Sequence, residues 1–420
     1  MVVNSRRLRS APLIAGVFFV PSLLMVLLGA SSFSSGLLLV CFLFVFFFMV
    51  GGKRRVHKKS LLMMSMVMLL IAMITTHFVF ISLVVDTGMP RDYGRVISSL
   101  IMMLFMSLAA IVVCSYIGNL NDSEFARSLK IIAILLVVNG VVGLLGIDVF
   151  NTGLIKPVLA FQEPSHFILC AIPFFIFFHK IARTKTAKTL LIIMFLIFGL
   201  YVKNLTAIAS VLFVISISSK KTIVSLMFIF LLSVIAYHLT PPEYLAYFAD
   251  RVNINNTNNM SLLVLIQGWE NAILSFSKNP FGEGFQQMGI TTATGDATQA
   301  LRIMAGQDVN ILDGGSTAPK IIAEFGVFGF ILLIVYVCLF IKVAYRLKSS
   351  TGDRRLIFMH SCFLATFFDM FVRGAGYFTP TLFMGVSSLM YIFCYDNCKP
   401  IKNEKIRTHG NEAPSGEQIN

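Results

Sequence analysis

The chain has 420 residues, of which 57% are hydrophobic and only 13% are charged. An ordinary soluble protein does not need so many unbroken apolar runs, so the composition excludes that class and favours an all-α, polytopic integral membrane protein. The formal net charge of +14 does not indicate a nucleic-acid partner, because the cations lie in short clusters between the apolar runs.

Twelve apolar runs are predicted to be transmembrane helices, each uncertain by a few residues at its ends. In chain order they cover residues 11–30, 36–52, 60–85, 96–117, 130–147, 166–180, 189–202, 204–218, 222–239, 321–341, 356–372 and 381–396. The seventh and eighth runs are short and almost continuous, so they are either two helices or one broken helix. Residues 1–398 are expected to form one membrane bundle, and residues 399–420 a polar cytoplasmic tail.

The basic residues predict the orientation of this bundle. With both chain ends in the cytoplasm, 25 of the 34 lysines and arginines fall in cytoplasmic segments and nine in outer segments. The outer loops are the longer ones and would otherwise collect more cations. The asymmetry therefore follows the positive-inside rule and supports this orientation.

One outer loop, residues 240–320, is far longer than an ordinary connection between helices, which indicates a functional segment. It contains the only tryptophan, Trp269, within an apolar stretch at residues 261–276. Gln, Glu and Asn are spaced through that stretch, so it is predicted to form a helix along the membrane interface.

The segment "FQEPSHF" opens the sixth run on the outer side. Pro164 suits the first helical turn, and the carboxylate of Glu163 would meet the positive end of the helix dipole, so a plain helix start is one interpretation. The other is that desolvation raises the pKa of Glu163 and makes it a general acid or base. His166 is a weaker catalytic candidate, because a histidine there more often forms a local hydrogen bond.

Two further pairs of opposite charge have helical spacing. Lys320 and Glu324 are four residues apart, which favours an ion pair within one helix. Asp369 and Arg373 have the same spacing in the eleventh run. Charges in a membrane helix often indicate function, but these two could also neutralise each other.

The sequence lacks HExxH, paired-cysteine, Walker and dinucleotide-binding motifs. A nucleotide-driven pump or a redox enzyme is therefore not expected, and neither a metal nor a cofactor is predicted. A transfer of sugars from a phosphate leaving group would need no metal if arginines stabilised the leaving phosphates.

Four pieces of the second half occur in a suggestive order: "FQEPSHF", "MSLLVLIQGWENAI" with "GEGFQQMG", "NILDGG" with "KIIAEFGVFG", and "RGAGYFTP". In these pieces the chain resembles the bacterial O-antigen polymerases, the Wzy family of the polymerase and ligase group. The resemblance implies a GT-C-like helical bundle in the bacterial inner membrane, with a large periplasmic loop that contains short helices. The first five runs match that family only in hydrophobicity.

The resemblance implies a metal-independent glycosyltransferase that works at the periplasmic face. It would transfer the growing glycan from undecaprenyl pyrophosphate to the non-reducing end of a new lipid-linked repeat unit. Its partners would be this lipid-linked oligosaccharide, the bilayer, and a chain-length regulator and a flippase of the same pathway.

Chemistry of this kind needs a proton acceptor, cations and apolar faces. Glu163 or Asp313, with His166 as a weaker candidate, would accept the proton of the acceptor hydroxyl. The remaining predicted site residues are cations for the pyrophosphate and apolar faces for sugar or polyprenyl groups: Arg251, Arg302, Lys320 and Arg373, then Trp269, Tyr377 and Phe378.

Two enzymatic or transport alternatives stay open, besides a purely structural membrane scaffold. An O-antigen ligase would usually carry a histidine at the start of the motif that here reads "DGGSTAPKIIAEFG", and an arginine where this chain has Leu265. A flippase for the lipid-linked unit would be expected to place charges along a path in mid-membrane, whereas most of those found here lie at the outer edge.

Overall fold

The computed structural model describes residues 10–30, 32–50, 58–86, 88–154, 156–218, 259–292, 294–350 and 352–395. Within these residues the protein is all-α, with fourteen helices and no β-strand. Six helices are long and apolar enough to cross a membrane: Ala11–Leu28, Leu61–Val84, Tyr93–Asn119, Asp122–Leu145, Pro164–Ile181 and Val327–Ser349. The predicted run at 222–239, Arg251 and the tail lie outside the described residues.

Each of the first eight predicted runs corresponds to one helix. They are α1 (Ser10–Leu28), α2 (Ser34–Val50), α3 (Lys58–Val84), α4 (Tyr93–Asn119), α5 (Asp122–Leu145), α6 (Pro164–Ile181), α7 (Lys185–Tyr201) and α8 (Leu205–Ser218). Helix α5 begins eight residues before the predicted start, at an acidic first turn that suits the helix dipole. The chain turns back sharply between α7 and α8, where Lys203 has a φ of 55°, so the two are separate helices.

The tenth predicted run is not one continuous helix. Helix α13 (Thr317–Phe325) ends at Gly326, and α14 (Val327–Ser349) begins immediately after it. Gly326 has a φ of 56°, which favours glycine, and a Cβ there would overlap the carbonyl oxygen of Pro280. The predicted run at 321–341 therefore corresponds to α14 from residue 327 onward, while its first residues belong to α13, because hydrophobicity alone does not report the break at Gly326.

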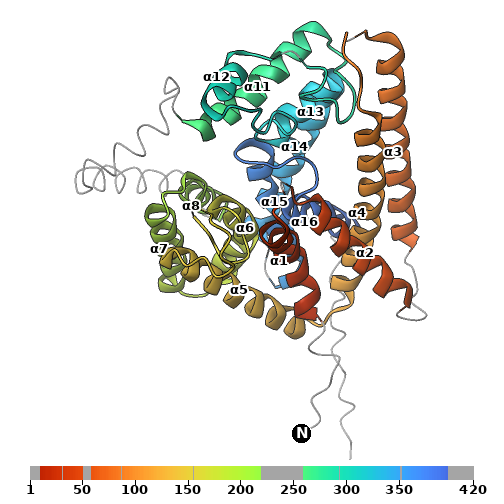
Figure 1. Ribbon diagram of the computed structural model, residues 1–420. Helices are drawn as coiled ribbons and strands as arrows, with labels where there is room; N and C mark the ends of the chain where they lie inside the picture. Colours follow the sequence, from red (N-terminus) through yellow and green to blue (C-terminus); the bar gives the residue numbers. More distant parts are fainter. Residues whose placement is uncertain are drawn as a thin grey trace, which may run out of the picture.

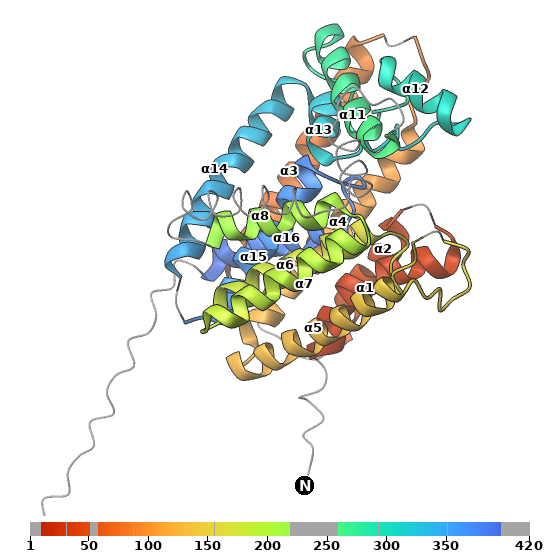
Figure 2. The same cartoon turned by 90° about the vertical axis from the view of Figure 1, so that its left-hand side faces the viewer.

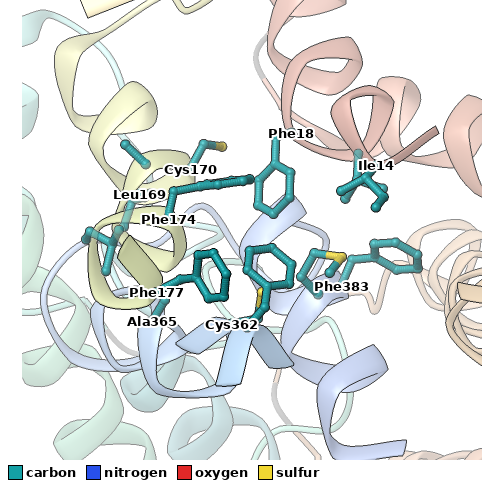
Figure 3. Packing of buried hydrophobic residues seen from close by; sticks show 14 of the residues in the cluster. Ile14, Phe18, Leu169, Cys170, Phe174, Phe177, Cys362, Ala365 and Phe383 are labelled. Carbon is teal, nitrogen blue, oxygen red and sulfur yellow. The ribbon is translucent and has the colours of Figure 1, made fainter. Parts of the chain in front are cut away.

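The centre of the bundle is formed by α6, α15 (Arg354–Phe371) and α16 (Pro380–Tyr395). Figure 3 shows α1 closing this core, with Phe18 against Phe174 at a centroid distance of 4.9 Å. Phe358 of α15 packs against Phe174 from the other side, at 5.3 Å. Helix α15 is buried inside the protein and is not among the six helices apolar enough to span a membrane.

We define the cap as α11 (Met260–Lys278), α12 (Asp296–Ala305), α13 and the loops that connect them. It lies at one end of the bundle, beside the ends of α3 and α4 (Figures 1 and 2). Arg91, between α3 and α4, donates a hydrogen bond to the carbonyl of Glu283 in the cap at 2.7 Å. The carboxylate of Glu270 in α11 accepts hydrogen bonds from the first N–H groups of α12. The cap is thus attached both to the bundle and within itself.

Gly268 of α11 packs directly on Gly314, where a Cβ would overlap the carbonyl oxygen of Gly314. We expect Gly268→Ala to separate the two segments and to destabilise the protein by about 1–3 kcal/mol, as overpacked substitutions do. Thermal unfolding of the purified protein would measure the loss. Gly16→Ala is the matched control, because its nearest neighbour beyond its own helix backbone is a methyl group of Val20 at 4.0 Å. Equal unfolding temperatures for the two variants would contradict the prediction.

Candidate functional site

Glu163 and Arg373 form an ion pair across 210 residues of sequence. The Nη2 atom of Arg373 donates to Oε2 of Glu163 at 2.9 Å, and the hydroxyl of Ser165 donates to the same oxygen at 2.8 Å. Glu163 is the N-cap residue of α6 and Pro164 is the first helical residue, so the predicted helix start is confirmed. The carboxylate does not cap the helix backbone, because it is turned towards Arg373.

The electrostatic surroundings of Glu163 differ from those expected. Burial raises the pKa of Glu163, but Arg373, His166 and the hydrogen bond from Ser165 together hold it below its ordinary value. The expectation of a raised pKa is therefore wrong. A carboxylate stabilised in its ionised form is a poorer proton acceptor, so this environment suits Glu163 better for holding Arg373 in place.

Asp369 and Arg373 do not form the helical ion pair that was considered as one possibility. Helix α15 ends at Phe371, and Arg373 lies beyond it, where it reaches Glu163. Oδ1 of the fully buried Asp369 accepts a hydrogen bond from the hydroxyl of Thr379 at 2.8 Å. The spacing was misleading because the helix stops before the second partner.

His166 occupies the first turn of α6 next to this pair. Its ring packs edge-on against Phe33 at a centroid distance of 4.7 Å. The Nδ1 atom is buried and has no hydrogen-bond partner within the described part of the chain. His166 therefore contributes to the field around Glu163 without a direct hydrogen bond to it.

A second charged cluster surrounds Asp313. Its Oδ1 atom lies 3.2 Å from Nζ of Lys320 and 3.8 Å from Nη2 of Arg95. Lys320 also lies 3.5 Å from Oε1 of Glu324, so the predicted helical ion pair is confirmed. Lys320 and Glu324 are completely buried, whereas the side chain of Asp313 is 33% exposed. Asp313 is therefore the carboxylate of this cluster that a substrate can reach.

Tyr377 joins the cluster through Glu324 and Lys320. Its hydroxyl donates to Oε2 of Glu324 at 2.8 Å, and its ring lies 5.3 Å from Nζ of Lys320. Burial and the neighbouring Glu324 raise the pKa of Tyr377 well above its ordinary value, so the phenol remains protonated and donates. The hydroxyl of Tyr377 is thus bound to Glu324 inside the protein.

The loop of residues 373–379 connects the two charged clusters. Arg373, the first residue of this loop, forms the ion pair with Glu163, and Tyr377 donates a hydrogen bond to Glu324. Between them, the N–H of Gly374 donates to the carbonyl of Gly315, and a Cβ on Gly376 would overlap Oδ1 of Asp313. Gly376 has a φ of 75°, so glycine is required there for both backbone shape and space. One short loop thus supplies a residue to each cluster.

Sequence reasoning missed Arg95. It lies in the first turn of α4 and donates from Nη2 to the carbonyl of Leu312 at 3.2 Å, beside Asp313. No motif marks it. The available signal was its position: it is one of the few cations that the predicted topology leaves on the outer side, where positive charge is otherwise scarce.

Three predicted binding residues lie apart from these contacts. Arg302 is exposed at the end of α12, where it pairs with Asp308 at 2.5 Å. Trp269 of α11 lines an apolar groove of about 330 Å³, whose other walls come from α13, α14 and α15. Phe378 packs at the edge of the bundle core. Among the described residues no group of three or more His, Cys, Asp or Glu side chains is arranged to hold a metal ion.

The Glu163–Arg373 pair makes a pH-dependent contribution to stability. Because the native pKa of Glu163 lies below its ordinary value of 4.5, the contribution is present above that value and disappears as the pH falls through the native pKa. We expect wild type to unfold at a slightly higher temperature than Glu163→Gln at neutral pH, and the difference to vanish in acid. Thermal unfolding across the acid range measures it.

The control for that comparison is Arg373→Ala combined with Glu163→Gln. The double variant should be no less stable than the less stable single variant, because the pair is lost only once. A difference between wild type and Glu163→Gln that does not change with pH would contradict the prediction.

Comparisons with known proteins give this chain no family. No protein-family model matches it, and no curated protein matches it either. The function is therefore inferred from the residues and the geometry of the site.

Proposed function

We propose that the protein is an O-antigen polymerase, a metal-independent glycosyltransferase at the periplasmic face of the bacterial inner membrane. It transfers the growing glycan from undecaprenyl pyrophosphate to the non-reducing end of a new lipid-linked repeat unit. One observation carries the proposal: contacts join four motifs that are distant in sequence. Glu163 contacts Arg373, Tyr377 contacts Glu324, and Gly268 packs on Gly314.

The proposed reaction assigns proton transfer to Asp313. The acceptor hydroxyl oxygen bonds to the anomeric carbon while the bond from that carbon to pyrophosphate breaks, and the electron pair leaves with the pyrophosphate. Asp313 takes the hydroxyl proton. Its Oδ1 atom faces Lys320 and Arg95, while Oδ2 has no hydrogen-bond partner within the described residues and is free to accept.

Arginines would stabilise the leaving group. Arg373 is 22% exposed and Arg95 20% exposed, and each uses one guanidinium nitrogen for its ion pair. Because Nη1 of Arg95 is buried, the remaining donors of Arg373 suit the charge that develops on pyrophosphate better. Arg251 stays a predicted contributor, whereas Arg302 is occupied by Asp308 on the surface.

The membrane arrangement follows from the same proposal. The bundle would span the membrane twelve times, with the cap in the periplasm and the basic clusters in the cytoplasm, as the positive-inside rule expects. Trp269 and the apolar groove that it lines would offer a surface for the polyprenyl chain. Growing chains would pass from here to the ligase, with a chain-length regulator and a flippase as pathway partners.

Chain extension by the purified protein tests the proposal. We expect the protein in lipid to extend a lipid-linked repeat unit without added metal or nucleotide. Asp313→Asn should slow extension by about 10²–10⁴-fold, as loss of a general base does, and Arg373→Ala should also slow it strongly. Lys278→Met, which removes an exposed cation from the cap, is the matched control and should leave the rate unchanged.

A complementation gel separates the rival functions. In a polymerase mutant the long polysaccharide should collapse to core carrying a single repeat unit, whereas loss of a ligase leaves core alone. Wild-type protein that extends no chain in lipid, or a null mutant that shows core alone, would refute the proposed polymerase.

A further inference from the structure

Lys320 was expected to bind substrate, but its position prevents this. The side chain is 0% exposed and its ammonium group is surrounded by protein. Nζ donates to the carbonyl of Leu312 at 2.5 Å and to Oδ1 of Asp313 at 3.2 Å, and lies 3.5 Å from Oε1 of Glu324. Nζ donates two hydrogen bonds, and Glu324 adds an ion pair without a hydrogen bond, since its Oε1 atom has no hydrogen-bond partner within the described residues. Complete burial therefore keeps a ligand away from this ammonium group.

The contacts of Lys320 act on Asp313 in two ways. The bond to Leu312 fixes the backbone immediately before Asp313, and the bond to Oδ1 fixes the orientation of its carboxylate. Arg95 binds the same two groups from α4, on the more exposed side. The turn itself is tight, since the N–H groups of Asp313 and Gly314 both donate to the carbonyl of Asn310. Asp313 is therefore held with Oδ2 as its free oxygen.

We propose that Lys320 is a positioning residue, which fixes the carboxylate of Asp313 from inside the protein so that Oδ2 meets the acceptor hydroxyl. This inference rests on the proposed function for its catalytic meaning. Lys320 touches no substrate. It acts through Asp313.

Glu324 and Tyr377 complete the arrangement. A buried ammonium group requires a nearby negative charge, and Glu324 supplies one from the next turn of α13. Tyr377 donates to Oε2 of Glu324, while Lys320 lies 3.5 Å from Oε1. The two carboxylates, Asp313 and Glu324, thus share the ammonium group of Lys320, and Tyr377 holds the carboxylate of Glu324 in place.

A variant must remove Lys320 without leaving a buried, unpaired carboxylate. We therefore compare Lys320→Met/Glu324→Gln with Glu324→Gln alone in the extension assay. Loss of Lys320 should lower kcat at least tenfold with little change in KM, because substrate contacts persist.

Introducing Asp313→Asn into both backgrounds separates positioning from general structural damage. If Lys320 acts through Asp313, its removal should cost nothing further once Asp313 is an amide. A kcat that falls equally in both backgrounds would overturn the proposal. Tyr377→Phe, which removes no charge, is a second variant: it should lower kcat several-fold at constant KM, and a wild-type kcat would count against the arrangement.

A measurement without substrate distinguishes this inference from the proposed function. Asp313→Cys places a thiol beside Lys320. The rate at which a membrane-impermeant maleimide modifies this thiol at different pH values reports its ionisation. The modification is measured on the peptide that contains the introduced cysteine. The apparent pKa of the thiol should be about one unit higher in the Lys320→Met/Glu324→Gln background than in the Glu324→Gln background. An unchanged pKa would refute the role of Lys320 even if the protein polymerises. A raised pKa without any chain extension would refute only the polymerase.

Discussion

The buried charge of Lys320 constrains the whole cap. An ammonium group removed from water is stable only if oxygen atoms surround it, and its partners come from the turn before α13, from α13 itself and, through Tyr377, from the loop after α15. Each of these segments must therefore reach the same small volume. The reversal at Gly326 makes this possible, because it turns α13 away from the line of α14.

Glycines allow the segments to approach closely enough. Gly268, Gly314 and Gly376 each lie where a Cβ would overlap a neighbouring atom, and the three come from α11, from the turn after Asp313 and from the 373–379 loop. The "GEGF" segment also approaches α13 closely, because the backbone N–H of Gly284 donates a hydrogen bond to the carbonyl of Glu324. These glycines belong to backbone packing around the buried ion pair, and their spacing in the sequence follows from that requirement.

Local sequence patterns predict those features that depend on residues a few turns apart. Apolar runs located most of the described helices, and the spacing of Lys320 and Glu324 predicted their pair, because both signals lie within a few turns. The break at Gly326 was missed because its cause, Pro280, is 46 positions earlier. The Glu163–Arg373 pair and the contact of Arg95 with Asp313 depend on chain segments more than 200 residues apart, which no local pattern reports.

The two partly exposed carboxylates, Glu163 and Asp313, have different surroundings. Glu163, whose side chain is 48% exposed, receives hydrogen bonds from Arg373 and Ser165 at one oxygen, which stabilises its charge. Asp313 is held by a buried ammonium group on one oxygen and leaves the other unpaired. Separate environments of this kind are how enzymes divide acid-base work between carboxylates. Under the proposed transfer from pyrophosphate, Asp313 would take the proton and Arg373 would meet the developing phosphate charge, so two separate side chains would serve the two steps.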